Sequence, residues 1–230
     1  MKFQKTPLTF MQKKTLLILP LLMLFLSSCL NYTQITTIKT DGSGEMFVHY
    51  WMKWEDKRDS LLLNKLHIFN EDSINSEFSS KYNTIERVET FVNYSDSTIH
   101  AQVELEFNNF DSLKFTKAFK GANFSLQDGP SETKIFSQFI APFPTGFGTK
   151  TDQFVITLVY YLPGEILDHN ASSKSRNKLT WEYSLADIGS GKTITATYRP
   201  FRLKETPPWV YYSTLAVIIV VLIYLFRKRK

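Results

Sequence analysis

Few side chains in this 230-residue sequence have the types and spacing that catalysis or metal binding requires. The four histidines, His49, His67, His100 and His169, lie far apart, and none has a second His or Cys at the spacing typical of metal ligands. A single cysteine excludes a disulfide framework and a cysteine-based zinc site within one chain. The sequence also contains no P-loop and no dinucleotide-binding fingerprint. We therefore expect no metal, no cofactor and no enzyme activity.

Glu104 and Glu106 come closest to a pair of catalytic carboxylates. They lie two residues apart and share one strand face with His100 and Gln102. Because these polar residues alternate with apolar ones, a solvated strand face explains them better than an acid–base site.

The single cysteine stands at the end of an N-terminal export signal. Residues 1–14 are basic, and an apolar run of about a dozen residues follows, too short to span a bilayer as a helix. Leu26-Ser27-Ser28-Cys29 then resembles the lipobox of bacterial lipoproteins. In such a motif, small residues let the signal peptidase reach the backbone, and the thiol accepts a diacylglyceryl group before cleavage between Ser28 and Cys29. The spacing predicts a signal peptide over 1–28 and a lipidated Cys29. An ordinary signal peptide with a chance cysteine is the alternative.

The C-terminal end has the pattern of a membrane-spanning helix. Residues 206–226 contain two prolines followed, from Trp209 to Phe226, by side chains without charge. As a helix this stretch is roughly 27 Å long, with aromatic residues at both ends. A basic tail at 227–230 predicts a cytoplasmic C-terminus. We expect a single-pass protein of the bacterial cytoplasmic membrane, with residues 29–205 as its extracytoplasmic domain.

Positive charge is concentrated at these two ends. Lys and Arg number 27 against 22 Asp and Glu, and four of the basic residues lie in 1–28 and four more in 227–230. The part between them is slightly acidic, so it lacks the basic face that a nucleic-acid-binding domain needs. We expect the membrane as partner, through the lipid and the helix, and no nucleic acid.

The domain itself has a predominantly β pattern. Two segments rich in Thr, Val, Ile and aromatic residues, 32–40 and 45–54, flank Asp41-Gly42-Ser43-Gly44 and predict a hairpin. Residues 99–107 alternate strictly, and 154–162 are apolar on both faces, as in a central strand. Further strands are expected at 135–141, 179–184 and 194–198.

Helical signals are fewer. Rough helical spacing over 56–82, with a start near Asn70, predicts one or two amphipathic helices. A short helix is expected at 111–119 with Asp111 as its N-cap. The expected fold class is α+β, a mostly antiparallel sheet with one or two packed helices, plus the C-terminal transmembrane helix.

Four of these features together resemble a family of bacterial envelope proteins related to the mycobacterial lipoprotein LppM. The resemblance implies an α/β domain with an apolar cavity and a role in binding envelope lipids, and it supplies no catalytic residues. It covers the two ends of the chain, and residues 109–153 lie outside it. The features are Cys29 after its lipobox, Asp41-Gly42-Ser43-Gly44, Leu162-Pro163-Gly164-Glu165-Ile166 with Asn170 before Leu179-Thr180-Trp181, and the C-terminal helix with its basic tail.

Aromatic residues are the candidates for lipid contact. Trp51 and Trp54 end the first hairpin, and Trp181 lies on a late strand. Phe143 and Phe147 stand in a loop rich in Pro and Gly, where exposed aromatic residues would need a reason. Core packing is the alternative for each of them.

Three basic residues, Arg199, Arg202 and Lys204, shortly precede the C-terminal helix. They would contact lipid phosphates at headgroup level or simply border the membrane.

The leading hypothesis is a non-enzymatic domain that binds a lipid or amphiphile at the outer face of the membrane. A module that recruits or scaffolds an envelope protein is the alternative, and an enzyme acting on envelope polymers is the third. A pocket of several hundred Å³ favours the first hypothesis. A solid core with an apolar surface patch favours the second, and a buried cluster of titratable groups favours the third.

Lipidation can be tested by intact mass. The membrane-extracted protein is expected to lack residues 1–28 and to carry the added mass of acyl chains. Cys29→Ala is expected to lose both changes, because the thiol is the attachment atom. A wild-type chain that keeps residues 1–28 or carries no lipid would end the lipoprotein hypothesis.

Overall fold

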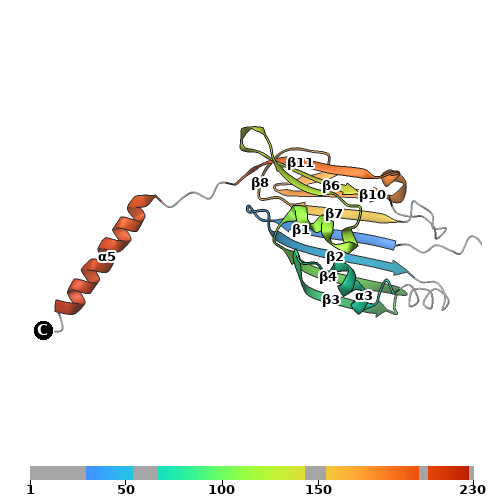
Figure 1. Cartoon of the computed structure of the whole chain (residues 1–230), viewed down its shortest axis with the longest axis horizontal. Helices are drawn as coiled ribbons and strands as arrows, with labels where there is room; N and C mark the ends of the chain where they lie inside the picture. Colours follow the sequence, from blue (N-terminus) through green and yellow to red (C-terminus); the bar gives the residue numbers. More distant parts are fainter. Residues whose placement is uncertain (1–29, 54–66, 143–153, 202–206, 228–230) are drawn as a thin grey trace, which may run out of the picture. The chain divides into compact units, whose positions relative to one another are not determined.

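The computed structural model describes residues 30–53, 67–142, 154–201 and 207–227. The chain divides into two compact units, the first ending at Pro200 and the second beginning at Phe201. In the first unit strands predominate and helices are few and short, so its α+β class is as expected (Figure 1).

A seven-stranded sheet, called the large sheet, forms the base of the first unit. Its neighbouring strands are antiparallel except for one parallel pair at the centre. In spatial order the strands are β3 (Asn83–Asn93), β4 (Thr98–Phe107), β2 (Gly44–Lys53), β1 (Leu30–Ile38), β7 (Val155–Tyr161), β10 (Lys178–Ser184) and β9 (Ser173–Ser175).

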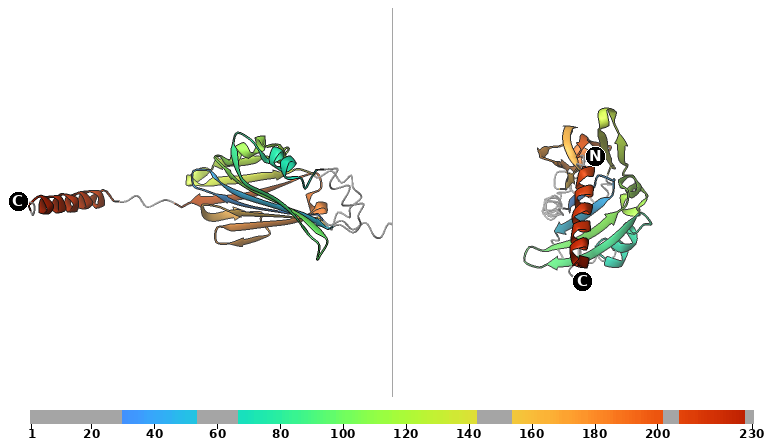
Figure 2. Two further views of the ribbon diagram at one scale, coloured as in Figure 1. Left: turned by 90° about the horizontal axis from the view of Figure 1, so that it is seen from below. Right: turned by 90° about the vertical axis from the view of Figure 1, so that its left-hand side faces the viewer.

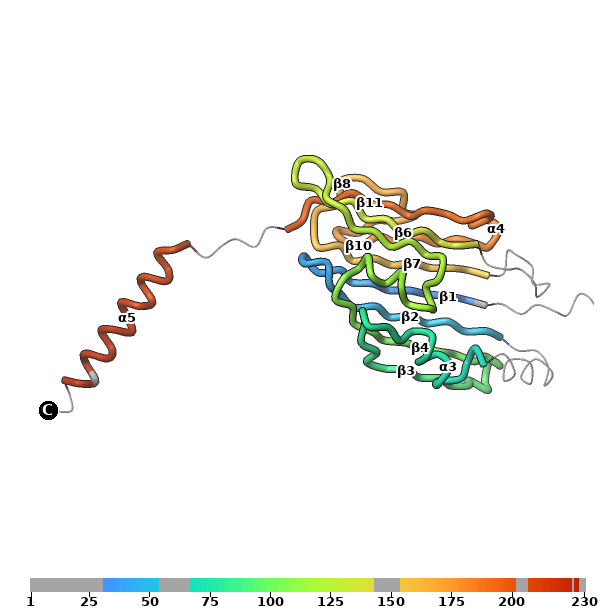
Figure 3. The backbone as a smooth tube through the Cα atoms, viewed as in Figure 1, coloured from blue at the N-terminus to red at the C-terminus, as the bar shows by residue number. Residues whose placement is uncertain are grey.

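The parallel pair is β1 and β7. The predicted first hairpin is confirmed as β1 and β2, and β7 lies on the other side of β1, as Figure 3 traces. Gln34 of β1 is opposite Leu158 of β7, and Tyr32 is opposite Ile156. The segment expected to be central, 154–162, therefore does lie inside the sheet.

Alternation along the strands defines the two faces of the large sheet. On β4, Ala101, Val103 and Leu105 are buried, while Gln102 and Glu104 point the other way and stay in contact with solvent. We call the buried side the inner face and the other side the outer face. The solvated strand face predicted for Glu104 is thus observed.

A four-stranded sheet, the small sheet, covers one part of the inner face. Phe136 of the small sheet places its ring 4.5 Å from that of Tyr160 on β7 and 5.9 Å from that of Trp181 on β10. In spatial order its strands are β5 (Phe124–Asp128), β6 (Lys134–Ile140), β11 (Lys192–Pro200) and β8 (Gly164–His169).

Short helices cover the other part of the inner face (Figure 2). The first of the described α-helices begins directly after Asn70, as predicted. Asn70 is its N-cap, because its side-chain oxygen accepts a hydrogen bond from the backbone N–H of Ser73. The helical elements are α3 (Glu71–Phe78), the 3₁₀ helices η2 (Phe110–Phe115), η3 (Lys117–Phe119) and η4 (Pro130–Glu132), and α4 (Leu185–Ile188).

The helix predicted at 111–119 needs correction. Two 3₁₀ segments replace it, and Asn109 rather than Asp111 is the N-cap of the first. The Asp111 carboxylate instead accepts a hydrogen bond of 2.6 Å from the backbone N–H of Leu126 on β5. A tertiary contact with the small sheet therefore takes the side chain that the local pattern assigned to capping.

The second unit contains α5 (Pro208–Arg227), on which Trp209 and Phe226 are exposed. None of the helices that the structure describes has the combined length and apolarity that crossing a membrane requires. The prediction of a membrane-spanning helix at 209–226 is therefore wrong, and the single-pass topology that depended on it loses its support. Tyrosine, serine and threonine occupy 211–214, so the uninterrupted aliphatic run is only 215–223, roughly 14 Å of helix.

The packing of the hairpin can be tested at Gly44, the first residue of β2. A Cβ there would lie 2.1 Å from the carbonyl oxygen of Thr37 and 2.5 Å from the ring of Phe107. We expect Gly44→Ala to lower the free energy of unfolding by about 1–3 kcal/mol, because backbone or ring must move. Glu45→Ala, at the exposed next residue, should cost less than about 1 kcal/mol. Urea unfolding of residues 30–205 compares the variants, and equal stabilities would contradict this packing.

Candidate functional site

Two adjoining cavities lie over β1, where the small sheet and the helices meet on the inner face. The first, which we call the glutamine cavity, has a volume of about 310 Å³. The second, the helix cavity, has about 560 Å³ and shares Tyr32 and Ala118 with the first. The glutamine cavity is lined by Tyr32, Gln34, Ala118, Phe119, Lys120, Ala122, Gln138, Phe139, Ile140, Ala141, Pro142, Ile156 and Leu158, and the helix cavity by Tyr32, Tyr50, His67, Ile68, Ser73, Ile74, Glu77, Phe78, Ala118 and Phe154.

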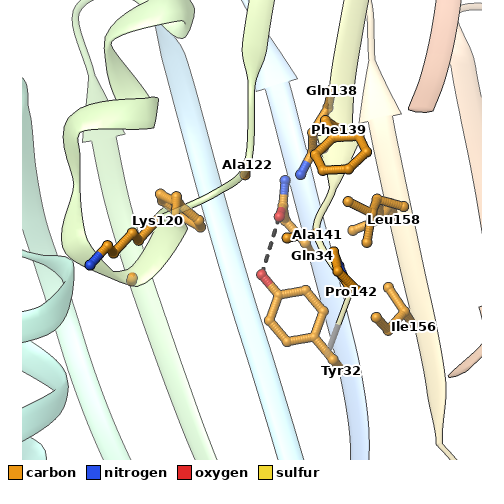
Figure 4. Close-up of a pocket in the computed structure, with 13 residues that line it drawn as sticks. Tyr32, Gln34, Lys120, Ala122, Gln138, Phe139, Ala141, Pro142, Ile156 and Leu158 are labelled. Atoms are coloured by element: carbon orange, nitrogen blue, oxygen red, sulfur yellow. Dashed lines mark hydrogen bonds between the residues drawn. The ribbon is translucent and has the colours of Figure 1, made fainter. Parts of the chain in front are cut away.

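The period of the strands brings these side chains to the cavities. Tyr32 and Gln34 are two residues apart on β1, so both point to the inner face. The parallel register sets Ile156 and Leu158 of β7 directly beside them, and Gln138 comes from β6 of the small sheet. Figure 4 shows these side chains gathered around one space.

A chain of hydrogen bonds runs along one wall. The Tyr32 hydroxyl donates to Gln34 Oε1 over 3.2 Å, and Gln34 Nε2 donates to the Tyr160 hydroxyl over 2.8 Å and to Thr36 Oγ1 over 3.1 Å. The Tyr160 hydroxyl in turn donates to Gln138 Oε1. This chain links β1 and β7 of the large sheet to β6 of the small sheet.

The phenols in this wall are held in their neutral form. Burial raises the pKa of Tyr160, and burial followed by the nearby Tyr50 phenol raises the pKa of Tyr32. Burial likewise raises the pKa of Tyr50. These hydroxyls therefore act as hydrogen-bond donors and acceptors near neutral pH, and not as bases.

Most of the remaining lining is apolar. Ile156, Leu158 and Ile140 face the glutamine cavity, and Ile74 and Phe78 face the helix cavity. Hydrophobic walls with a few fixed polar groups are typical of sites for apolar or amphiphilic ligands.

The three predicted lipid-contact residues that the structure describes, Trp51, Trp181 and Arg199, do not line the cavities. Trp181 is fully buried, and its indole N–H donates to Asn170 Oδ1 over 2.8 Å. Trp51 lies on the outer face, 5.9 Å between ring centroids from His100. Arg199 is exposed, 3.6 Å from the Glu165 carboxylate. Ser28, Cys29, Trp54, Phe143, Phe147 and Arg202 lie outside the described residues.

Gln34 and Gln138, the buried amide side chains of the glutamine cavity, were not predicted from the sequence. A signal was present, because each glutamine stands two residues from side chains that the same alternation buries. Thr36 and Ile38 follow Gln34 on its face, and Phe136 and Ile140 flank Gln138. A polar residue inside a buried alternation needs a partner, and so it indicates a buried polar contact.

The outer face carries a second cluster. His49 Nε2 and His100 Nδ1 are 3.0 Å apart, and the ring of Phe91 stacks on that of His100 at 4.6 Å. Burial, and then the charge of His100, lowers the pKa of His49, while burial lowers the pKa of His100 against the opposing effect of Asp96. Over the part of the chain described, no group of three or more His, Cys, Asp or Glu is placed to hold a metal ion.

Comparisons with known proteins show a likeness to solved structures and none at the level of sequence families. No protein-family model and no curated protein matches the chain. Among solved structures it is similar to the folded domain of LppM from Mycobacterium tuberculosis, determined by NMR, with 14% identity, a TM-score of 0.49, and coverage of 77% of this chain and 94% of that domain. The likeness concerns the folded domain, not the lipobox or the C-terminal helix. At this level it determines neither a ligand nor an activity.

The hydrogen-bonded wall can be tested at Tyr160. Tyr160→Phe leaves Gln138 Oε1 and one N–H of Gln34 without their buried partner, so the free energy of unfolding should fall by about 1–3 kcal/mol. Tyr161→Phe removes a hydroxyl from the next residue, whose side chain points to the outer face, and should be close to neutral. Thermal and urea unfolding compare the two variants. A neutral Tyr160→Phe would mean that the wall does not join the sheets.

Proposed function

We propose that the first unit is a non-enzymatic domain that binds a lipid or similar amphiphile in the glutamine cavity and the helix cavity. The observation that carries the proposal is the pair of adjoining cavities, about 310 and 560 Å³, on the inner face of the large sheet. Sites for small ligands commonly have volumes of roughly 300–1,000 Å³.

The chemistry of the walls supports an amphiphile over a polar metabolite. Isoleucine, leucine and phenylalanine side chains would accept hydrocarbon, whose burial is worth roughly 0.8 kcal/mol per CH₂. The buried polar groups, Gln34 and Gln138, come from opposite sheets and stand together on one wall. An extended ligand with one polar group and an apolar body matches that distribution.

The N-terminal signal supports a place for this binding in the bacterial envelope. Cys29, at the end of the lipobox, precedes Tyr32 by three residues, and Tyr32 contributes to both cavities. Three residues of chain reach at most about 11 Å. An acyl group on Cys29 would therefore keep Tyr32 close to the lipid surface from which a ligand would come.

A second candidate function is the docking of an envelope protein on the outer face. Phe91 is 39% exposed although its ring stacks on that of His100, and Trp51 is near the same imidazole. Partly exposed aromatic residues on an open sheet face favour an interaction surface. This candidate uses the face opposite the cavities.

Native mass spectrometry of residues 30–205 tests the proposal. The domain is secreted without either terminal segment and purified without detergent from its own envelope. We expect a bound species of lipid mass that organic extraction removes. A protein without any bound species would count against lipid binding and direct the search to a protein partner by crosslinking.

A matched pair of variants locates the bound species. Ala118 is exposed and belongs to both cavities, so Ala118→Trp should fill their junction and abolish binding with little effect on stability. Lys117→Trp adds the same ring at the preceding exposed residue, which is not part of either lining, and should leave binding intact. Retention of the ligand by Ala118→Trp would place it elsewhere.

A further inference from the structure

The glutamine cavity contains a buried hydrogen-bond donor that no other described residue uses. The Gln138 side chain is 5% exposed, and its Oε1 accepts from the Tyr160 hydroxyl. Among the described residues no partner is found for its Nε2. In Figure 4 the nitrogen of Gln138 is directed into the space beside Gln34.

The directions of the hydrogen bonds along the wall place the Nε2 of this amide on the cavity side. Gln34 Oε1 accepts from Tyr32, so Gln34 Nε2 is the atom that donates to the Tyr160 oxygen. The Tyr160 hydroxyl then has its single proton left for Gln138, which must present Oε1 to it. The Nε2 of Gln138 consequently faces the cavity with two N–H groups.

Gln34 differs from Gln138 in this respect. Both N–H groups of Gln34 are used, one by Thr36 Oγ1 and one by Tyr160, and its oxygen is used by Tyr32. Gln34 therefore sets the direction of the hydrogen bonds along the wall, whereas Gln138 has N–H groups that can bind a ligand. A buried donor without a partner is unfavourable, and an acceptor on a ligand would remove that cost.

We propose that Gln138 Nε2 donates to an uncharged carbonyl oxygen of the bound lipid, so that the preferred ligand class is an acyl ester and not a free fatty acid or a pure hydrocarbon. This inference rests on the proposed function. The acyl chain lies against Ile156 and Leu158 and extends past Tyr32 toward the helix cavity.

The charge of the site separates an ester from a carboxylate. Lys120 is the only cation among the described residues that line the glutamine cavity, and it is exposed. Gln138 is buried, and its amide donor carries no charge to offset that of a carboxylate. Desolvation therefore opposes an ionised ligand at Gln138, whereas a neutral carbonyl needs only the hydrogen bond.

The test uses two probes of equal size, methyl laurate and pentadecane, each with 15 non-hydrogen atoms. Each displaces an environment-sensitive fluorescent dye from residues 30–205, a segment that contains the whole core of the first unit. We expect the ratio of the affinity for methyl laurate to the affinity for pentadecane to be roughly tenfold higher in the wild type than in Gln138→Leu, because transfer of the probes from water contributes equally in both proteins. Ionised laurate should bind less tightly than its methyl ester.

Two substitutions of Gln138 isolate the donor. Gln138→Leu removes the amide. It should weaken the binding of methyl laurate relative to that of pentadecane, while the affinity for pentadecane itself is kept. Gln138→Met keeps the length of the side chain and has no N–H or O–H donor, so it should show the same loss even if Gln138→Leu unfolds. Gln127→Leu, an exposed glutamine outside the lining, should behave as wild type.

The outcomes separate this inference from the proposed function. The same ratio of methyl laurate to pentadecane affinity in wild type and in Gln138→Leu would overturn the role of Gln138 and leave a lipid-binding cavity. A preference for ionised laurate would overturn the ester class. Failure of every probe to displace the dye, although the dye itself binds, would overturn the proposed function together with the inference.

Discussion

The parallel pairing of β1 with β7 is the constraint on which the rest of the first unit depends. β1 begins at Leu30, and its partner begins at Val155, more than a hundred residues later. Everything on the β3 side of the large sheet comes from the first half of the domain, and β7, β10 and β9 come from the second. This one pairing turns two groups of strands into a single base, and it sets Gln34 beside Leu158.

Buried amides are an unusual choice for a layer between two sheets, where leucine would fill the space at no cost in hydrogen bonds. The small sheet contacts the large one mainly through rings, among them Phe136, Tyr160 and Trp181. Aromatic contacts tolerate sliding, since offset and edge-on arrangements have similar energies. The directional contacts from Gln34 through Tyr160 to Gln138 give the stack one preferred position. Specificity of packing, rather than gross stability, is the property that such a buried network can supply.

The sequence predicted those elements whose signal is local. The first hairpin, the strand at 99–107, the helix start at Asn70 and the central position of β7 follow from alternation, capping and apolar runs. The four-stranded sheet was not predicted, because β5 and β8 are short and polar on one side, and because β11 pairs with β6 and β8, which lie far from it in the sequence. The membrane-spanning helix was predicted from an uncharged stretch with aromatic ends and a basic tail, a pattern that counts tyrosine, serine and threonine as if they were aliphatic.

The site was less predictable than the fold. Tryptophan and phenylalanine suggested an apolar pocket in general terms, but Trp181 fills the core and Trp51 belongs to the other face. The residues at the cavities are close together only because β1 pairs with β7 in the large sheet and β6 of the small sheet packs against them. No spacing in the sequence indicates that arrangement.

The position of β1 has one more consequence, for the order in which the strands are synthesised. Among the described strands β1 is synthesised first, and its parallel partner β7 follows only after β2 to β6. One edge of β1 therefore stays unpaired until Tyr161 has been made.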